Sequence, residues 1–181
     1  MLLAVGVVLL VVVERDGYQV LQIGNWEAPF GITLVADYLS AVMVVITAIV
    51  AVAVSVYALG DVDARMEYLG YHALFNVLIA GVMGAFLTGD LFNLYVWFEV
   101  MLMASFGLLV LDRKPEPLTG AIKYVTVNLI STLFFITAIG LIYGLTGTLN
   151  MADLHIKAAG VENTALLNAA AMLLMIAFGI K

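Results

Sequence analysis

The sequence contains no cysteine in 181 residues and only three prolines. Without cysteine it has no disulfide bond, no thiolate metal site and no cysteine nucleophile. Charge is also scarce, because Asp, Glu, Lys and Arg make up only 11% of the residues, whereas soluble domains average about 25%. Hydrophobic residues make up 65% of the chain. This composition predicts an integral membrane protein with no separate soluble domain.

Positive charge is the rarer sign, since seven Lys and Arg face 13 Asp and Glu, for a net charge of −6. Nucleic-acid binding needs a basic face, so we expect no nucleic-acid partner. The chain has no phosphate-binding glycine loop, no GxGxxG and no Ser–His–Asp pattern. Its two histidines, His72 and His155, stand far apart, which argues against a metal site. We expect no metal, no cofactor and a transporter rather than an enzyme.

Long apolar runs dominate what is present. The hydrocarbon core of a bilayer is about 30 Å thick and needs roughly 20 apolar residues per helix. The chain therefore has room for five or six crossings, and the predicted fold class is all-α, a polytopic transmembrane helix bundle forming one domain over 1–181. The first and last runs are short and lie at the chain ends, so we interpret the chain as a fragment of a longer membrane protein. The expected helices are 1–13 (partial), 32–59, 68–87, 90–111, 119–143 and 165–181 (partial).

Two polar connections carry turn and cap signals. Asp16-Gly17 and Gly24-Asn25 enclose a roughly alternating stretch, which predicts a short hairpin within 14–31. In the connection 144–163, Thr148 or Asn150 is the expected start of a short surface helix. Three further acids are expected to lie at the interface or to cap helices: Asp37, Asp90 and Asp153. Four small residues are expected to let the helix over 68–87 approach a neighbour closely: Ala80, Gly81, Gly84 and Ala85.

The basic residues predict the orientation, because Lys and Arg gather in cytoplasmic loops. If alternate loops share a side, four basic residues fall on one face and two on the other. The loops 61–67 and 112–117 are then cytoplasmic, and the hairpin is extracytoplasmic. The four are Arg65, Arg113, Lys114 and Lys123; the two are Arg15 and Lys157.

One carboxylate, Glu99, lies deep inside an apolar run. If its helix begins near Asp90, a rise of about 1.5 Å per residue places Glu99 roughly 13 Å in, close to the midplane. A charge there costs at least about 2.5–3.5 kcal/mol on insertion scales. We favour a role in handling protons or cations over passive hydrogen bonding. Tyr95, four residues earlier on the same face, is either a hydrogen-bond neighbour or a packed aromatic.

Five other residues are candidates for a polar path, for helix contacts or for anchoring. Lys181 either flanks a helix end and extends toward the interface, or lies near mid-membrane as a second ionisable group. We interpret Lys123 as a determinant of topology, and a proton relay is the less favoured alternative. Asn128, Ser131 and Thr132 span one helical turn and either hydrate a path or bridge helices.

The run GAFLTGDLFNLYVWFEVMLMASFGLLVL, over 84–111, resembles the proton-conducting antiporter-like subunits of respiratory complex I and their relatives. More narrowly, it is similar to the D-subunit family of Mrp-type multisubunit sodium/proton antiporters. Three other stretches support that narrower resemblance: 24–41 (GNWEAPFGITLVADYLSA), 123–135 (KYVTVNLISTLFF) and 143–154 (YGLTGTLNMADL).

The resemblance implies a bundle of about fourteen helices in two inverted repeats, of which this chain covers the end of the second helix to the middle of the seventh. It matches Glu99 to a key glutamate of the fifth helix and Lys181 to a key lysine of the interrupted seventh helix. The implied function is proton translocation, with Na⁺ or another monovalent cation, in a hetero-oligomeric antiporter of a prokaryotic cell membrane. Two alternatives remain: an antiporter-like subunit of a redox-driven proton pump, such as complex I or a membrane-bound hydrogenase, and a structural membrane scaffold.

Overall fold

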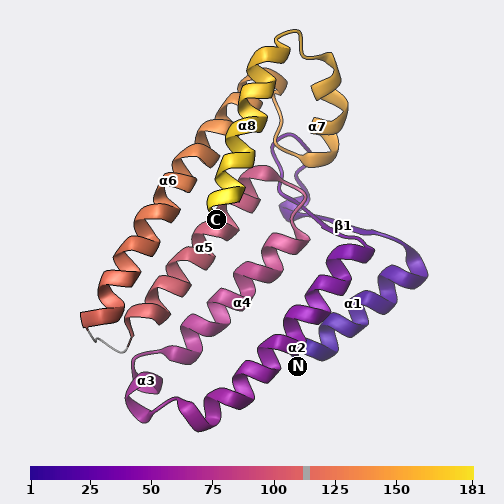
Figure 1. The fold of residues 1–181 in the computed structure, drawn as a ribbon. Coiled ribbons are helices and arrows are strands. Elements are labelled where there is room, and N and C mark those ends of the chain that lie inside the picture. Colours follow the sequence, from indigo (N-terminus) through magenta and orange to yellow (C-terminus); the bar gives the residue numbers. More distant parts are fainter. Residues whose placement is uncertain (112–114) are drawn as a thin grey trace.

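The computed structural model describes residues 1–111 and 115–181. Six helices form the bundle, and each packs against the next one along the chain. The six helices of the bundle are α1 (Leu2–Asp16), α2 (Tyr38–Asp61), α4 (Tyr71–Leu87), α5 (Leu91–Val110), α6 (Pro115–Thr146) and α8 (Thr164–Ile180). The first five lie side by side in chain order, whereas the last, α8, lies between α5 and α6 in the view of Figure 1. Arg113 and Lys114, two of the four basic residues that predict a cytoplasmic side, lie outside the described residues. The shorter elements are β1 (Gln19–Gln22), β2 (Thr33–Ala36), α3 (Ala64–Tyr68), α7 (Met151–Lys157) and the 3₁₀ turns Ile23–Asn25 and Ala158–Gly160.

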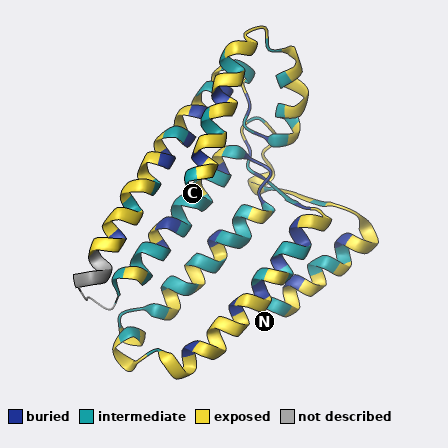
Figure 2. Ribbon diagram, viewed as in Figure 1, coloured by how far each residue is buried: buried dark blue, intermediate teal, exposed yellow. Residues whose placement is uncertain are grey.

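Exposed apolar surface covers the outer faces of these helices (Figure 2). Such a surface is stable in hydrocarbon and not in water, so it fits a multi-pass membrane protein. Within the described residues, three helices are long and apolar enough to cross a bilayer. They are Tyr38–Asp61, Leu91–Val110 and Thr119–Thr146, while α4 and α8 are apolar but have 17 residues each. The all-α membrane fold class is confirmed.

The helix expected to begin at residue 32 begins only at Tyr38, so that prediction was wrong. Residues 33–36 instead form β2, which pairs antiparallel with β1, Gln19 opposite Ala36 and Gln22 opposite Thr33. The hairpin therefore extends beyond the predicted 14–31. Asp37 sets the helix start through a capping box, because its carboxylate accepts from the Ser40 amide at 2.7 Å and its own amide donates to the Ser40 hydroxyl at 2.8 Å. The hydrogen bond that the carboxylate accepts from the Ser40 amide is the main reason why the pKa of the Asp37 carboxyl is lowered.

Other helix ends follow local signals more closely. Asp90 caps α5 by accepting from the Asn93 amide at 2.8 Å, as predicted. The helix expected over 119–143 begins four residues earlier, at Pro115, because proline is tolerated in the first turn, where its missing amide has no helical partner. It ends at Thr146, before Gly147 with φ 68°, so Gly144 lies inside the helix. The helix expected over 1–13 continues to Asp16.

A polar joint, made of Thr33, Thr88, Asp90, Asn93 and Asn150, connects the hairpin, the α4–α5 turn and the start of α7. All five residues are buried. The Gly89 amide donates to the Thr33 carbonyl, and the Met151 amide to the Gly89 carbonyl, both at 2.8 Å. The Asn150 side-chain amide donates to the Thr33 hydroxyl at 2.9 Å. The joint fixes the N-terminus of α5, and therefore the depth at which α5 carries Glu99.

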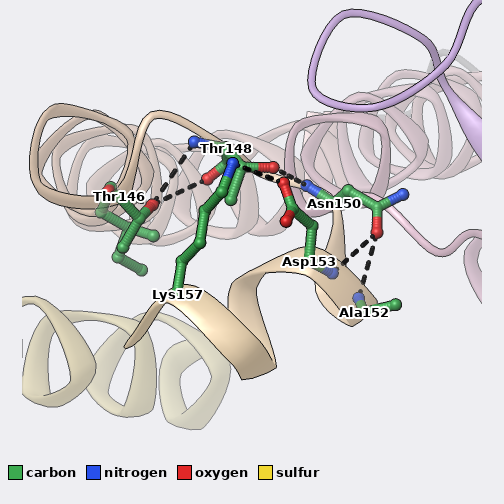
Figure 3. A network of polar contacts seen from close by, with 7 residues as sticks. Thr146, Thr148, Asn150, Ala152, Asp153 and Lys157 are labelled. Carbon is green, nitrogen blue, oxygen red and sulfur yellow. Dashed lines mark hydrogen bonds and ion pairs between the residues drawn. The ribbon is translucent and has the colours of Figure 1, made fainter. Parts of the chain in front are cut away.

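Asn150, rather than Thr148, starts the predicted surface helix α7. Its side-chain oxygen accepts hydrogen bonds from the backbone amides of Ala152 and Asp153, each at 3.1 Å. One turn later, the Lys157 ammonium donates to the Asp153 carboxylate at 2.8 Å (Figure 3). The hydrogen bond from Lys157 lowers the pKa of the Asp153 carboxyl. Asp153 is thus a first-turn acid and not a cap.

We expect Asn150→Ala to destabilise the protein more than the loss of an ordinary cap. The substitution removes a cap, for about 1 kcal/mol, and a buried hydrogen bond to Thr33, for about 1–2 kcal/mol more. Asn163→Ala is the matched control, because Asn163 caps α8 at an exposed position through one bond to the Leu166 amide. The measurement is the Tm of each variant in detergent, and equal losses for the two variants would contradict the role of the joint.

Candidate functional site

Glu99 on α5 meets residues from two other helices. The Thr132 hydroxyl, on α6, donates to Glu99 Oε1 at 2.6 Å. The ammonium nitrogen of Lys181, directly after α8, lies 3.6 Å from the same oxygen. The Lys181 side chain is 9% exposed and that of Glu99 27% exposed, so the lysine is the more buried partner. The structure thus brings together the two ionisable residues that the sequence singled out.

A cluster of phenylalanine rings lies beside Lys181. Phe98, Phe135 and Phe178 pack edge to face, with ring centroids 5.2–5.9 Å apart. The Lys181 nitrogen lies 5.3 Å from the centroid of the Phe98 ring, within the range of a cation–π contact. In such an apolar setting a single charge is costly, whereas two opposite charges in contact offset part of each other's desolvation. The geometry therefore favours the two groups as a pair.

Ser131 and Thr132 are neighbours on α6, and each positions one member of the Glu99–Lys181 pair through a hydrogen bond. Thr132 holds the Glu99 carboxylate, as described above. Ser131 is fully buried and donates to the Ala177 carbonyl at 2.7 Å, and this carbonyl also accepts the backbone amide of Lys181 at 3.2 Å. Both hydroxyl hydrogens are therefore committed to positioning, which favours the helix-bridging interpretation over the polar-path interpretation for these two residues.

The other sequence candidates take different places. Asn128 is half-buried and lines a cavity next to Lys181. Lys123 is exposed, and among the described residues no hydrogen bond or ion pair joins it to Glu99 or Lys181. Tyr95 packs on Phe135 with ring centroids 6.0 Å apart, so the packed-aromatic interpretation is the one the structure supports.

Sequence reasoning missed a contact between α5 and α6. The Ser105 and Tyr124 hydroxyl oxygens lie 2.9 Å apart. The available signal was the spacing of Tyr124, which stands four residues before Asn128 and eight before Thr132, and so shares their face of the helix. The partner on α5 carries no such signal, because a lone serine in a transmembrane helix most often bonds its own backbone.

Similarity to known proteins extends over nearly the whole chain. The model of the family described as "NADH:quinone oxidoreductase/Mrp antiporter, TM" matches residues 88–181. The chain is 44% identical over 180 residues to the D subunit of a Na⁺/H⁺ antiporter from Alkalihalophilus pseudofirmus, covering 99% of this chain and 36% of the relative. It is 46% identical over 169 residues to the D subunit of a probable K⁺/H⁺ antiporter from Rhizobium meliloti, covering 91% of this chain and 31% of the relative.

Solved structures show the same fold. A chain of the Mrp complex from Dietzia sp. superposes with a TM-score of 0.83 at 32% identity, over 97% of this chain and 33% of that one. A chain of an archaeal membrane-bound sulfane sulfur reductase superposes with a TM-score of 0.83 at 26% identity, over 97% of this chain and 37% of that one. The chain spans about a third of the length of the relatives that it matches.

Proposed function

The chain belongs to the NADH:quinone oxidoreductase/Mrp antiporter family, and from this premise we propose that it is the proton-translocating part of the D subunit of a multisubunit Na⁺/H⁺ antiporter. The subunit works with other membrane subunits in a prokaryotic cell membrane and exchanges protons for Na⁺ or another monovalent cation. The contact between Lys181 and Glu99 at 3.6 Å carries the proposal, because it places two titratable groups together among apolar helices.

In the proposed mechanism, the Lys181 ammonium carries the proton and the Glu99 carboxylate is its counter-charge. A cation or a second proton that arrives at Glu99 competes with the ammonium for the carboxylate. Lys181 then releases its proton from Nζ to a water molecule, which becomes hydronium, and the neutral lysine leaves no uncompensated charge among the phenylalanine rings. When the competitor leaves, Lys181 takes up a proton again. Binding at one group and proton loss at the other are reciprocally coupled.

The test is cation-driven proton movement in inside-out vesicles. The complete operon, with the full-length subunit, is expressed in cells that lack their own antiporters, and a pH gradient is built up across the vesicles. Addition of Na⁺ is expected to dissipate that gradient in the absence of any electron donor. Gradient loss that requires an electron donor would instead support the redox-pump alternative, which the similarity to a sulfane sulfur reductase chain favours.

Thr132→Val is expected to lower the antiport rate about tenfold or more, because a hydrogen bond to a charged group contributes about 1.5–3 kcal/mol. Thr132→Ser keeps the hydroxyl and is expected to retain most of the rate. The assay is the same vesicle measurement, corrected for the amount of assembled complex.

Thr137→Val is the matched control for Thr132. Thr137 lies on the same helix, is exposed, and donates only to the Leu133 carbonyl of its own helix at 2.7 Å. We expect this variant to transport like the wild type. If Thr132→Val also transports like the wild type, the carboxylate does not depend on Thr132, and the proposed positioning is wrong.

A further inference from the structure

A cavity of about 740 Å³ lies between the hairpin, the α4–α5 turn and α7. Neither member of the Glu99–Lys181 pair lines it, so it is separate from the site described above. Small-molecule sites in proteins have volumes of about 300–1,000 Å³, so this cavity has the size for a small organic ligand. One face of the two paired strands forms the hairpin side of the cavity: Val20, Gln22, Thr33 and Val35.

Apolar side chains from three elements contribute to the cavity wall. The hairpin contributes Val20 and Val35, α4 contributes Phe86, and α7 contributes Met151 and Ile156. Ile156 is 75% exposed, so the cavity is reached from outside the described chain. A hydrated inorganic ion gains nothing from contact with apolar groups, whereas the apolar body of an organic molecule leaves water when it binds there. The wall therefore favours an organic ligand.

Two side-chain amides that line the cavity have N–H groups available. Asn150, which is 6% exposed, donates one N–H to the Thr33 hydroxyl at 2.9 Å, and among the described residues its second N–H has no partner. The oxygen of the Gln22 amide accepts from the same hydroxyl at 2.8 Å, and its nitrogen has no partner in the described part of the chain. A ligand with a hydrogen-bond acceptor, such as an ester carbonyl, would satisfy either group.

The charged side chains of the lining leave one negative charge uncompensated. Lys157 and Asp153 form an ion pair at 2.8 Å and compensate each other (Figure 3). The other charged side chain of the lining is Asp37, and none of the ion pairs within the described residues involves it. The hydrogen bond from the Ser40 amide lowers the pKa of this carboxyl, so it is ionised at neutral pH. The lining thus complements one positive charge and repels an anion.

We propose that this cavity is a binding site for a small organic cation that arrives from the extracytoplasmic side. The positive group lies at the Asp37 carboxylate, the apolar body lies between the hairpin and α7, and an acceptor group takes the free N–H of Asn150 or Gln22. A choline ester has all three parts and serves as the probe. The site is independent of the proposed function, because binding at it needs no transport.

Protection of a cysteine from labelling tests the site. Ile156→Cys is introduced into the full-length subunit, with any cysteine elsewhere in that subunit removed, and the assembled complex is prepared in right-side-out vesicles. An uncharged, membrane-impermeant maleimide is added outside, with or without butyrylcholine. At a concentration about ten times its Kd, butyrylcholine is expected to slow the labelling about tenfold, because an occupied site does not react. The control ligand is the neutral analogue in which a carbon atom replaces the ammonium nitrogen, and it is expected to give little protection.

Two controls on the protein are matched to this design. Asp37→Asn removes the charge and keeps the helix cap, because asparagine caps helices about as well as aspartate. It is expected to raise the Kd for butyrylcholine about fivefold, the factor for one exposed ion pair. Asp63→Asn is its control, since Asp63 also caps a helix, through the Met66 amide at 2.7 Å, but does not line the cavity. His155→Cys, exposed beside Ile156 and outside the lining, is expected to be labelled with or without butyrylcholine.

Four results would each overturn the proposal. They are an unreactive Ile156→Cys beside a reactive His155→Cys, absence of protection by butyrylcholine, equal protection by its neutral analogue, and an unchanged Kd in Asp37→Asn. The first would show that another part of the complex covers the cavity. Protection as expected in a complex without cation-driven proton movement contradicts only the proposed function, and normal transport without protection contradicts only this site. Assembly of each variant is checked by co-purification of the other subunits.

Discussion

Glu99→Ala is expected to abolish cation-driven proton movement while the complex still assembles. The substitution removes the counter-charge that lies 3.6 Å from Lys181 and leaves that lysine among phenylalanine rings without a partner. Removing one member of a buried ion pair costs about 3–5 kcal/mol, so the lysine is then expected to stay neutral and to carry no proton. Lys181→Ala removes the proton carrier itself and is expected to have the same effect. The measurement is Na⁺-dependent dissipation of a pH gradient in inside-out vesicles.

The conservative variants and one control decide the interpretation. Glu99→Asp keeps the charge at a shorter reach and is expected to retain part of the rate, whereas Glu99→Gln keeps the shape and is expected to lose it. Glu14→Ala, which removes an exposed carboxylate at the end of α1, is expected to transport normally. Normal transport by assembled Glu99→Gln and Lys181→Ala would refute the ion-pair mechanism and favour the structural-scaffold alternative.

Gly84→Ala is expected to destabilise the protein strongly. A Cβ at Gly84 would overlap the indole ring of Trp97, and one at Gly81 would lie 2.6 Å from Met101 Cγ, so α4 and α5 approach each other too closely for a side chain. Trp97 stands only two residues before Glu99, so any outward shift of α5 also displaces the carboxylate. Overpacking typically costs about 1–3 kcal/mol, and because the indole ring is rigid we expect this case at the upper end.

The measurement for Gly84→Ala is the amount of monodisperse protein after extraction and its Tm in detergent, each relative to the wild type. Gly140→Ala is the matched control, since a Cβ at Gly140, also within a long apolar helix, meets nothing within 4 Å. We expect Gly140→Ala to match the wild type. A Gly84→Ala protein as abundant and as stable as Gly140→Ala would show that the close approach of α4 and α5 is not required.

Local signals in the sequence were sufficient for the membrane class, for several helix ends and for the choice of Glu99 as a candidate site residue. Hydrophobic runs of about 20 residues predict membrane crossings because a helix of that length and apolar composition spans the hydrocarbon core of a bilayer. Asp90 was recognised as a cap, and Asn150 as one of two candidates, because a cap acts within three residues of itself. Glu99 stood out because a carboxylate in an apolar run is rare for energetic reasons.

The same local reasoning failed at residues 33–36. This stretch is apolar and continues directly into the α2 run, so hydropathy does not distinguish a strand from the first turn of a helix. Residues 33–36 form a strand because they pair with Gln19–Gln22 and because the Thr33 carbonyl accepts a hydrogen bond from the Gly89 amide. Those partners come from elsewhere in the chain.

The composition of the site was decided by tertiary structure. The sequence singled out Glu99, but it left two interpretations of Lys181 open and only a resemblance favoured the mid-membrane one, and it gave Ser131 and Thr132 no defined partners. Helix rotation and depth determine which residues meet, and in helices that are apolar on nearly every face the sequence pattern does not fix that rotation. Packing of α5, α6 and α8 around the phenylalanine rings does fix it, and so brings Lys181 and Thr132 to the same oxygen of Glu99.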